Sequence, residues 1–172
     1  IADKATVAGV EVEIRKNLFV RPLSSAANGM NKLSFGLNGS YIYTNAKMPL
    51  ATVTTGSQLE GAAPWIANFD LSHNFTKGNH SFINTLVFNY VSDKIYTIGT
   101  QGYQDIIEQG MMTLDFVSQA KLNKYVSLTL KARNLLNPSY KLSRKANESG
   151  EKVVLSDYKK GINISLGVSC TF

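Results

Sequence analysis

Residues 161–172, at the end of the chain, alternate strictly between apolar and small or polar side chains. The apolar positions are Ile162, Ile164, Leu166, Val168, Cys170 and Phe172. Because side chains two residues apart share one face of an extended chain, this segment predicts a β-strand with one apolar face. A half-buried strand of a soluble sheet shows the same alternation. The length, the small polar face and the terminal aromatic residue favour a strand between lipid and a water-filled lumen.

Six earlier segments repeat the alternation, and each predicts a further strand. They cover residues 6–18, 33–43, 65–75, 81–91, 112–122 and 126–133. Most are close to the 9–11 residues that a tilted strand needs to cross a bilayer. No segment approaches the ~18 consecutive apolar residues of a membrane-spanning helix. We therefore expect an all-β chain with about seven antiparallel transmembrane strands.

The segments between these strands differ in length, and the differences alternate along the chain. Residues 44–64, 97–110 and 137–160 are expected to be long polar loops, because they contain proline, glycine and many polar side chains. Residues 76–79 and 123–125 are expected to be tight turns, and residues 19–32 a loop of intermediate length. Short turns on the periplasmic side and long loops outside the cell are typical of outer-membrane barrels.

This orientation places aromatic residues at both membrane interfaces, where Trp and Tyr are enriched. The residues expected at the outer interface are Tyr41, Tyr43, Trp65 and Tyr90, and those at the inner interface are Phe75, Tyr125 and Phe172. Seven strands cannot close by antiparallel pairing, and even eight strands leave no channel. We therefore interpret residues 1–172 as one partial domain, the C-terminal segment of a larger barrel.

The composition adds little chemistry to this picture. The net charge of +6 comes from 18 Lys and Arg against 12 Asp and Glu, spread along the chain rather than gathered on one patch. Such spreading is unlike a nucleic-acid surface. The single cysteine, Cys170, has no partner in the chain, and His73 and His80 are the only histidines. With no nucleophile–base set in view, we expect no enzyme activity, no metal site and no cofactor.

Seven charged or polar side chains occupy the positions expected to face the lumen. They are Glu11, Glu13, Arg15, Asp115, Gln119, Lys131 and Arg133. Two interpretations remain open for them. They contact a plug or a ligand, or they form cross-strand pairs that hydrate the wall, which is the commoner use of such residues.

Several stretches together resemble the C-terminal barrel region of TonB-dependent outer-membrane receptors, in the Bacteroidetes style that includes SusC-type transporters. They are AGVEVEIRKNL (8–18), LSFGLNGSYIYTNAKM (33–48), FNYVSDKIYTIG (88–99), SLTLKARNLLNPSY (127–140) and the terminal LGVSCTF. The order and spacing of these stretches agree over nearly the whole chain. In such receptors, 22 strands surround a plug. The resemblance therefore implies that this chain supplies roughly the last seven strands.

The resemblance also implies a function and partners. These are energised uptake of a scarce ligand (a siderophore, vitamin, glycan or peptide) into the periplasm, with a plug and a TonB-contacting segment that have no counterpart in these residues. Lipopolysaccharide, the barrel-assembly machinery and a surface lipoprotein lid are further expected partners, and Phe172 resembles the terminal assembly signal. The alternatives are a plug-less porin or surface adhesin, and a soluble lipocalin-like barrel.

Overall fold

The computed structural model describes all residues except 1–3, 24–28, 48–57, 101, 147–149 and 172. The described part contains eleven β-strands arranged in two antiparallel sheets. No helix within it is long and apolar enough to span a membrane.

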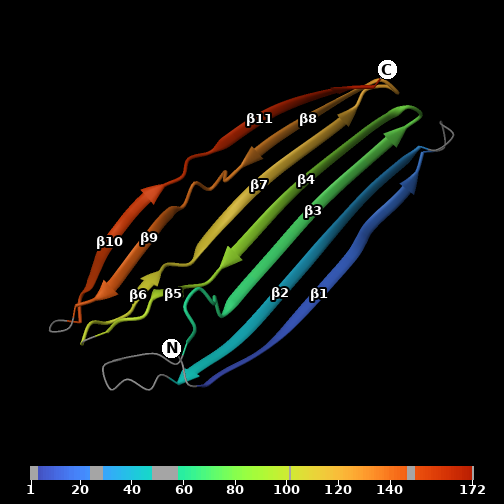
Figure 1. The fold of residues 1–172 in the computed structure, drawn as a ribbon. Coiled ribbons are helices and arrows are strands. Elements are labelled where there is room, and N and C mark those ends of the chain that lie inside the picture. Colours follow the sequence, from blue (N-terminus) through green and yellow to red (C-terminus); the bar gives the residue numbers. More distant parts are fainter. Residues whose placement is uncertain (1–3, 24–28, 48–57, 101, 147–149, 172) are drawn as a thin grey trace.

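Seven strands form one continuous sheet in the order β1-β2-β3-β4-β7-β8-β11 (Figure 1). Their bounds are β1 Lys4–Pro22, β2 Met30–Lys47, β3 Trp65–Lys77, β4 His80–Val91, β7 Met111–Lys121, β8 Val126–Arg133 and β11 Asn163–Cys170. Every neighbouring pair is antiparallel. The predicted all-β class and the seven predicted strands are therefore confirmed. We call this seven-stranded sheet the wall.

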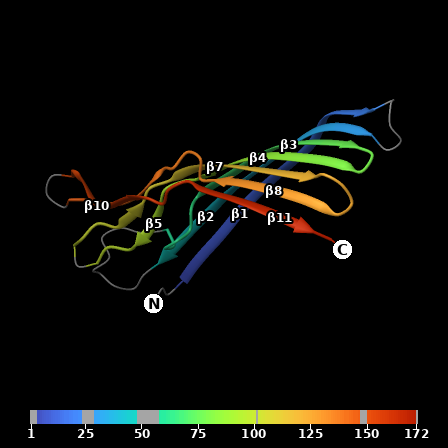
Figure 2. The same cartoon turned by 90° about the horizontal axis from the view of Figure 1, so that it is seen from above.

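The sheet is twisted and open, as the second view shows (Figure 2). In the described residues, β1 pairs only with β2, and β11 pairs only with β8. The two tight turns, after β3 and β7, lie at the same end of the sheet as the end of β11 (Figure 1). The longer connections lie at the opposite end, as the alternation of connection lengths predicts.

Two expectations about the connections are wrong. The loop expected at residues 19–32 is shorter than predicted, because β1 runs to Pro22 and β2 begins at Met30. The two strands pair as far as Pro22 and Met30, with a register shift between Asn17 and Phe19. That shift adds one residue to β1 and is a β-bulge, which explains why the strict alternation stops there although the strand continues.

The second wrong expectation concerns the long polar loops at 97–110 and 137–160. Four short strands lie in and beside them and form a separate sheet in the order β10-β9-β6-β5. Their bounds are β5 Lys94–Thr97, β6 Ile106–Glu108, β9 Ser139–Lys145 and β10 Lys152–Lys159. The two loops pair with each other through β6 and β9. This sheet continues the wall at the end with the long connections (Figure 1).

The interior of the described chain is very small. Only Ala46, Ala63 and Ile95 are buried apolar residues in the described part. The accessible surface is 11370 Å², whereas a compact soluble monomer of 18.8 kDa would expose roughly 8,300 Å². The free energy that stabilises this fold must therefore come largely from the hydrogen bonds between strands and from contacts outside the described residues.

Candidate functional site

The register of the seven-stranded sheet assigns each side chain to one of two faces. Residues paired across antiparallel strands lie on the same face, so a row of pairs crosses the sheet on one side. One such row runs from Arg15 through Gly36, Asp70 and Val87 to Asp115. The row beside it on this face runs from Glu13 through Asn38, Asn68 and Asn89 to Thr113. We call this side the polar face.

The opposite side, the apolar face, carries the large hydrophobic side chains. One of its rows links Phe35, Leu71, Leu86, Phe116, Ala132 and Ile164. No described element covers this face near the sheet edges, where Leu166 is 72% and Val10 60% exposed. A continuous exposed apolar surface of this kind marks a membrane or protein contact.

Aromatic side chains stand toward both ends of the apolar face. Tyr41 and Trp65 pair across β2 and β3 with ring centroids 4.5 Å apart, toward the end with the long connections. Phe75 pairs with Phe82 near the tight turn at the other end. Their positions match the two expected aromatic levels. Tyr125 lies in the second tight turn, and Phe172 lies outside the described residues.

All seven candidate lumen residues lie on the polar face. Arg15 and Asp115 belong to one row, whereas Lys131 and Gln119 lie nearer the tight turns, opposite Val117 and Thr129. Arg133 ends β8 opposite Asn163. The structure does not gather the seven into one cluster, but divides them between the two edges of the sheet. Contact of these residues with a plug or a ligand stays a prediction.

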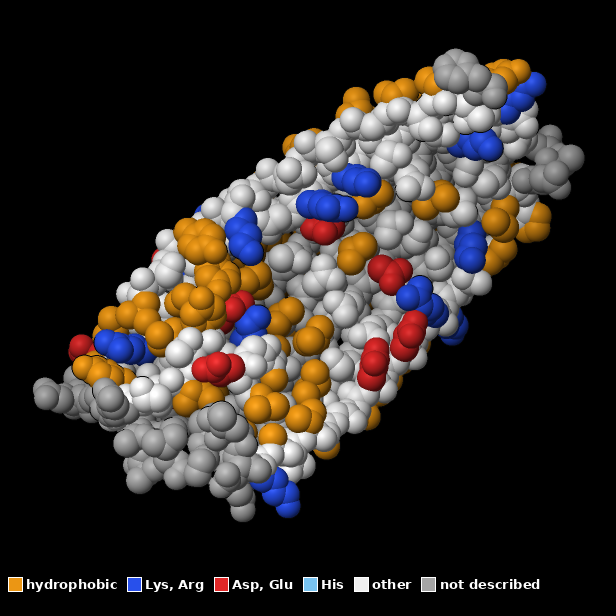
Figure 3. All heavy atoms as spheres, viewed as in Figure 1, with side chains coloured by type: hydrophobic (Ala, Val, Ile, Leu, Met, Phe, Trp, Pro, Cys, Tyr) orange, Lys and Arg blue, Asp and Glu red, His pale blue; other side chains and the backbone are white. Residues whose placement is uncertain are grey.

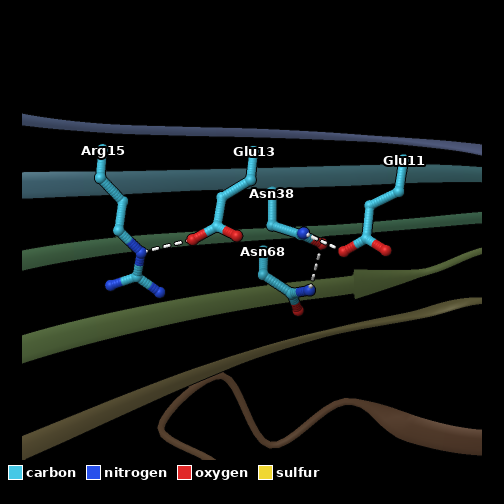
Figure 4. A network of polar contacts seen from close by, with 5 residues as sticks. All are labelled: Glu11, Glu13, Arg15, Asn38 and Asn68. Carbon is cyan, nitrogen blue, oxygen red and sulfur yellow. Dashed lines mark hydrogen bonds and ion pairs between the residues drawn. The ribbon is translucent and has the colours of Figure 1, made fainter.

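A polar network joins the members on β1 to residues of the next two strands (Figure 4). Arg15 Nε donates to Glu13 Oε1, and Asn38 Nδ2 donates to Glu11 Oε1. Asn68 Nδ2 in turn donates to Asn38 Oδ1 over 3.4 Å. These side chains point to the same side of the sheet and leave donors and acceptors free toward the lumen.

Gly36 leaves room for a carboxylate beside the same network. A methyl group at this position would overlap Asp70 Oδ1, so the missing side chain is what lets the Asp70 carboxylate lie across β2 toward Arg15. Asn38, Asn68 and Asp70 were not among the candidate site residues. Their even spacing on the polar side of their strands is the signal in the sequence that points to them.

The second cluster lies where the seven-stranded sheet meets the four-stranded sheet. A cleft of about 370 Å³ opens there, lined by Met111, Thr113, Asp115, Arg133, Asn134, Pro138, Tyr140, Lys160, Gly161 and Asn163. Asp115 and Arg133, both candidates from the sequence, thus share one cleft. Lys160 and Tyr140 come from the segment expected to be a loop, and only the folded arrangement brings them there.

The backbone around this cleft is fixed by side-chain hydrogen bonds. Asn134 and Asn137 have left-handed φ angles of 58° and 45°. Asp115 Oδ1 accepts from the Asn134 N–H over 2.8 Å, and Asn134 Nδ2 donates to the Gly161 carbonyl over 2.7 Å. Asn137 Oδ1 accepts from the Gly161 N–H over 3.0 Å. These bonds hold the breaks after β8 and before β11 side by side.

Tyr140 forms the wall of the cleft toward the four-stranded sheet. Its hydroxyl donates to Glu108 Oε2 over 3.1 Å, and Lys94 Nζ lies 3.2 Å from the other carboxylate oxygen. Burial raises the pKa of Tyr140 to about 12, with the Glu108 hydrogen bond adding to the shift. Lys160 Nζ lies 5.4 Å from the centre of the Tyr140 ring.

Charged side chains of both signs lie over the polar face (Figure 3). Acidic side chains lie over β1 and β2 with basic side chains among them, and basic side chains lie over β8 beside an acidic one. Hydrophobic side chains gather over the four-stranded sheet. No group of three or more His, Cys, Asp or Glu side chains able to hold a metal ion lies in the described residues.

Comparison with known proteins agrees with these two faces. The family model described as TonB dependent receptor-like, beta-barrel matches residues 1–135. The chain therefore belongs to this family of bacterial outer-membrane β-barrels, which are transport receptors rather than enzymes. No curated protein and no solved structure matches the chain.

Membership of this family indicates which face of the sheet meets lipid and which faces the interior of the barrel. In an outer-membrane barrel, strands alternate between a face toward lipid and a face toward a polar interior. The apolar face described above is therefore the lipid side, and the polar face is the lumen side. TonB-dependent receptors as a class work with a plug and with TonB.

Proposed function

We propose that this chain is the C-terminal barrel segment of a SusC-like transporter of the Bacteroidetes type, which takes up a scarce ligand into the periplasm. The ligand in this proposal is a siderophore, a vitamin, a glycan or a peptide. The observation that carries the proposal is the polar face of β1 to β3, where the network of Glu11, Glu13, Arg15, Asn38 and Asn68 presents unfilled hydrogen-bonding groups to the interior.

An ionised carboxylate has two acceptor oxygens, so a single hydrogen bond leaves capacity for a further partner. Here Glu11 and Glu13 are each bound by one neutral or cationic neighbour, and Arg15 is 74% exposed along its side chain. A plug seated in the lumen would meet this surface. We therefore assign the β1–β3 network to plug contact, and we take the remaining strands of a 22-stranded barrel and the plug as partners on the same receptor.

The four-stranded sheet belongs outside the cell in this proposal. Lipopolysaccharide would surround the lipid side of the wall, a surface lipoprotein lid would meet the outer loops, and TonB would act from the periplasm. Phe172, outside the described residues, would serve the barrel-assembly machinery. A plug-less porin or adhesin is the alternative, whereas a lipocalin-like soluble barrel disagrees with the uncovered apolar face.

The proposal is tested by energised uptake in cells. Cells with and without the whole receptor are grown in defined medium containing all four ligand classes, and depletion of each compound is measured by mass spectrometry. We expect one compound to be depleted only when both the receptor and TonB are present. Depletion that continues without TonB would instead support the porin alternative.

The orientation has a separate test in intact cells. Cysteine is introduced in place of Lys152 on β10, or of Lys124 in the turn after β7, in receptor with Cys170 replaced by serine. A maleimide too large to enter the periplasm should label the Lys152 position and leave the Lys124 position unlabelled. The reverse pattern would overturn the proposed orientation.

A further inference from the structure

The side chains that line the cleft between the two sheets carry more positive than negative charge. Two cations line it, Arg133 and Lys160, against one carboxylate, Asp115. Asp115 Oδ1 already accepts the Asn134 N–H. Neither cation forms an ion pair within the described part of the chain. An excess of positive charge therefore faces the open volume.

Arg133 and Lys160 both line the cleft, so one anion bound there could contact both side chains. Arg133 is the last residue of β8, and Asn163, its partner across the ladder, begins β11. Lys160 precedes Gly161, whose amide and carbonyl are held by Asn137 and Asn134. Both side chains are thus carried by backbone that three hydrogen bonds fix in place, which lowers the entropic cost of binding.

The remaining walls are apolar or aromatic. Met111 and Pro138 line the cleft beside the Tyr140 ring, whose hydroxyl is turned to Glu108. Tyr140 is braced by Tyr158, with ring centroids 5.0 Å apart. A volume of about 370 Å³ lies within the range of small-molecule sites, which combine apolar walls with a few placed polar groups.

We propose that this cleft binds a small anionic ligand, in which a carboxylate or phosphate group contacts Arg133 and Lys160 and an apolar or aromatic body packs on Tyr140. The proposal deepens the proposed function, since it rests on the cleft facing the receptor lumen and names the ligand chemistry. Arg133 supplies a planar pair of donors suited to an oxyanion, and Lys160 a mobile point charge.

The competing occupant is an acidic side chain of the plug. The neighbouring surface argues for a soluble ligand, because the cleft lies at the end of the wall with the long connections, beside the four-stranded sheet, where an entering molecule arrives first. Across the sheet, the two carboxylates of Glu11 and Glu13 outnumber their one basic partner, Arg15, so that network favours an anion less than the cleft does.

The test uses the whole receptor, plug included, purified in a neutral detergent. Phenyl phosphate and benzoate are the anionic probes, and benzamide is the neutral probe of the same shape as benzoate. Binding is followed by ligand-observed saturation-transfer NMR and by calorimetry. We expect benzoate and phenyl phosphate to bind at least about tenfold more tightly than benzamide, because charge-assisted hydrogen bonds form only with the anions.

The variants Arg133→Gln and Lys160→Gln should each weaken the binding of phenyl phosphate by about tenfold and leave benzamide unchanged. Lys124→Gln removes the same charge at the far end of the wall and is the matched control, expected to bind as the unmodified receptor. Tyr140→Leu should weaken both anionic and neutral probes, since it removes the aromatic wall but no charge.

Three results would overturn the proposal. The first is equal binding of benzoate and benzamide, and the second is anion binding that neither charge-removing variant changes. The third is anion binding seen only after the plug is deleted, which would assign the cleft to a plug side chain. Failure of the proposed function is distinguishable, because it appears as uptake independent of TonB in the cell assay whatever the probes do.

Discussion

The lipid-facing role of the apolar face gives its sharpest prediction at Leu166 in the middle of β11. Leu166 is 72% exposed on the apolar face, and its neighbour Gly167 lies on the polar face opposite Thr129. Replacing each in turn with arginine therefore places the same charge on opposite sides of one strand. The strand is the same, and the depth in the membrane differs by only one residue.

The expected cost differs between the two sides. An arginine at the bilayer midplane on the lipid side of a barrel destabilises by about 2–4 kcal/mol. Loss of the leucine adds about 1–2 kcal/mol, because most of a side chain worth roughly 1.5–3 kcal/mol is removed from lipid. Leu166→Arg should therefore destabilise the receptor by about 3–6 kcal/mol.

Gly167→Arg should cost far less. A Cβ at Gly167 would lie 3.8 Å from the Thr129 carbonyl oxygen, an ordinary contact, and its φ is not in the left-handed region. The side chain would then extend into a hydrated lumen. We expect a change within about 1 kcal/mol, since replacing glycine within a strand also reduces the entropy lost on folding.

Both variants of the whole receptor are incorporated into lipid vesicles, and unfolding is followed by heat-modified mobility on cold SDS gels. The fraction of cellular receptor that reaches the outer membrane is measured in parallel. A lower midpoint and yield are expected for Leu166→Arg alone. If the two variants unfold alike, or Gly167→Arg is the weaker one, the assignment of the two faces is wrong.

Two further predictions concern the polar side of the molecule. Because the pKa of Tyr140 is raised to about 12 from roughly 10 in the unfolded chain, its stabilising effect should be complete below pH 10 and fall as the pH rises toward 12. Ultraviolet titration near 295 nm should show one late-titrating phenol that is missing in Tyr140→Phe, and titration of all phenols together would contradict the burial of Tyr140 and its contact with Glu108. Gly36→Ala should displace the Asp70 carboxylate, the movable end of its side chain, and destabilise by about 1 kcal/mol or less, whereas Gly39→Ala, where a Cβ meets nothing within 4 Å, should be neutral in the same thermal assay. Equal effects of the two alanines would contradict the crowding at Gly36.

The wall could be predicted from the sequence because its two faces meet different solvents. Val10 and Glu11, or Leu166 and Gly167, differ in polarity because one side chain of each pair faces lipid and the next faces the lumen. The sequence therefore alternates between apolar and polar residues with a period of two. The same alternation correctly sends Arg15 and Asp115, which are 100 positions apart in the sequence, to one row on one face.

The four-stranded sheet could not be predicted by the same means. Its strands lie beyond the expected membrane level, so neither face must be apolar, and β9 carries Lys141, Arg144 and Lys145 within seven residues. Its pairing of β6 with β9 joins segments more than thirty residues apart. Such strands depend on tertiary contacts that override local composition.

The residues of the cleft also divide into those that the sequence pattern predicts and those that it does not. Arg133 was found because it ends an alternating strand, whereas Tyr140 and Lys160 lie in segments that composition describes as loop. The left-handed Asn134 and Asn137 that join these segments have a weak signal in the sequence, since asparagine tolerates this conformation better than other residues. Asparagine also favours ordinary loops, so the signal does not separate the two cases.

A common level of strand breaks explains why the cleft lies where it does. The hairpin of β1 and β2 runs unbroken, but the next strands are interrupted at residues 92–93, 109–110, 134–138 and 160–162. At each break a hydrogen bond replaces the ladder, such as Gly110 N to Asp93 Oδ1 or Leu135 N to the Leu114 carbonyl. Because the breaks release side chains from strict alternation, Lys160 and Tyr140 can turn toward Arg133 and Asp115. The cleft lies at this level of strand breaks, which is why the charged cleft and the second sheet occur together.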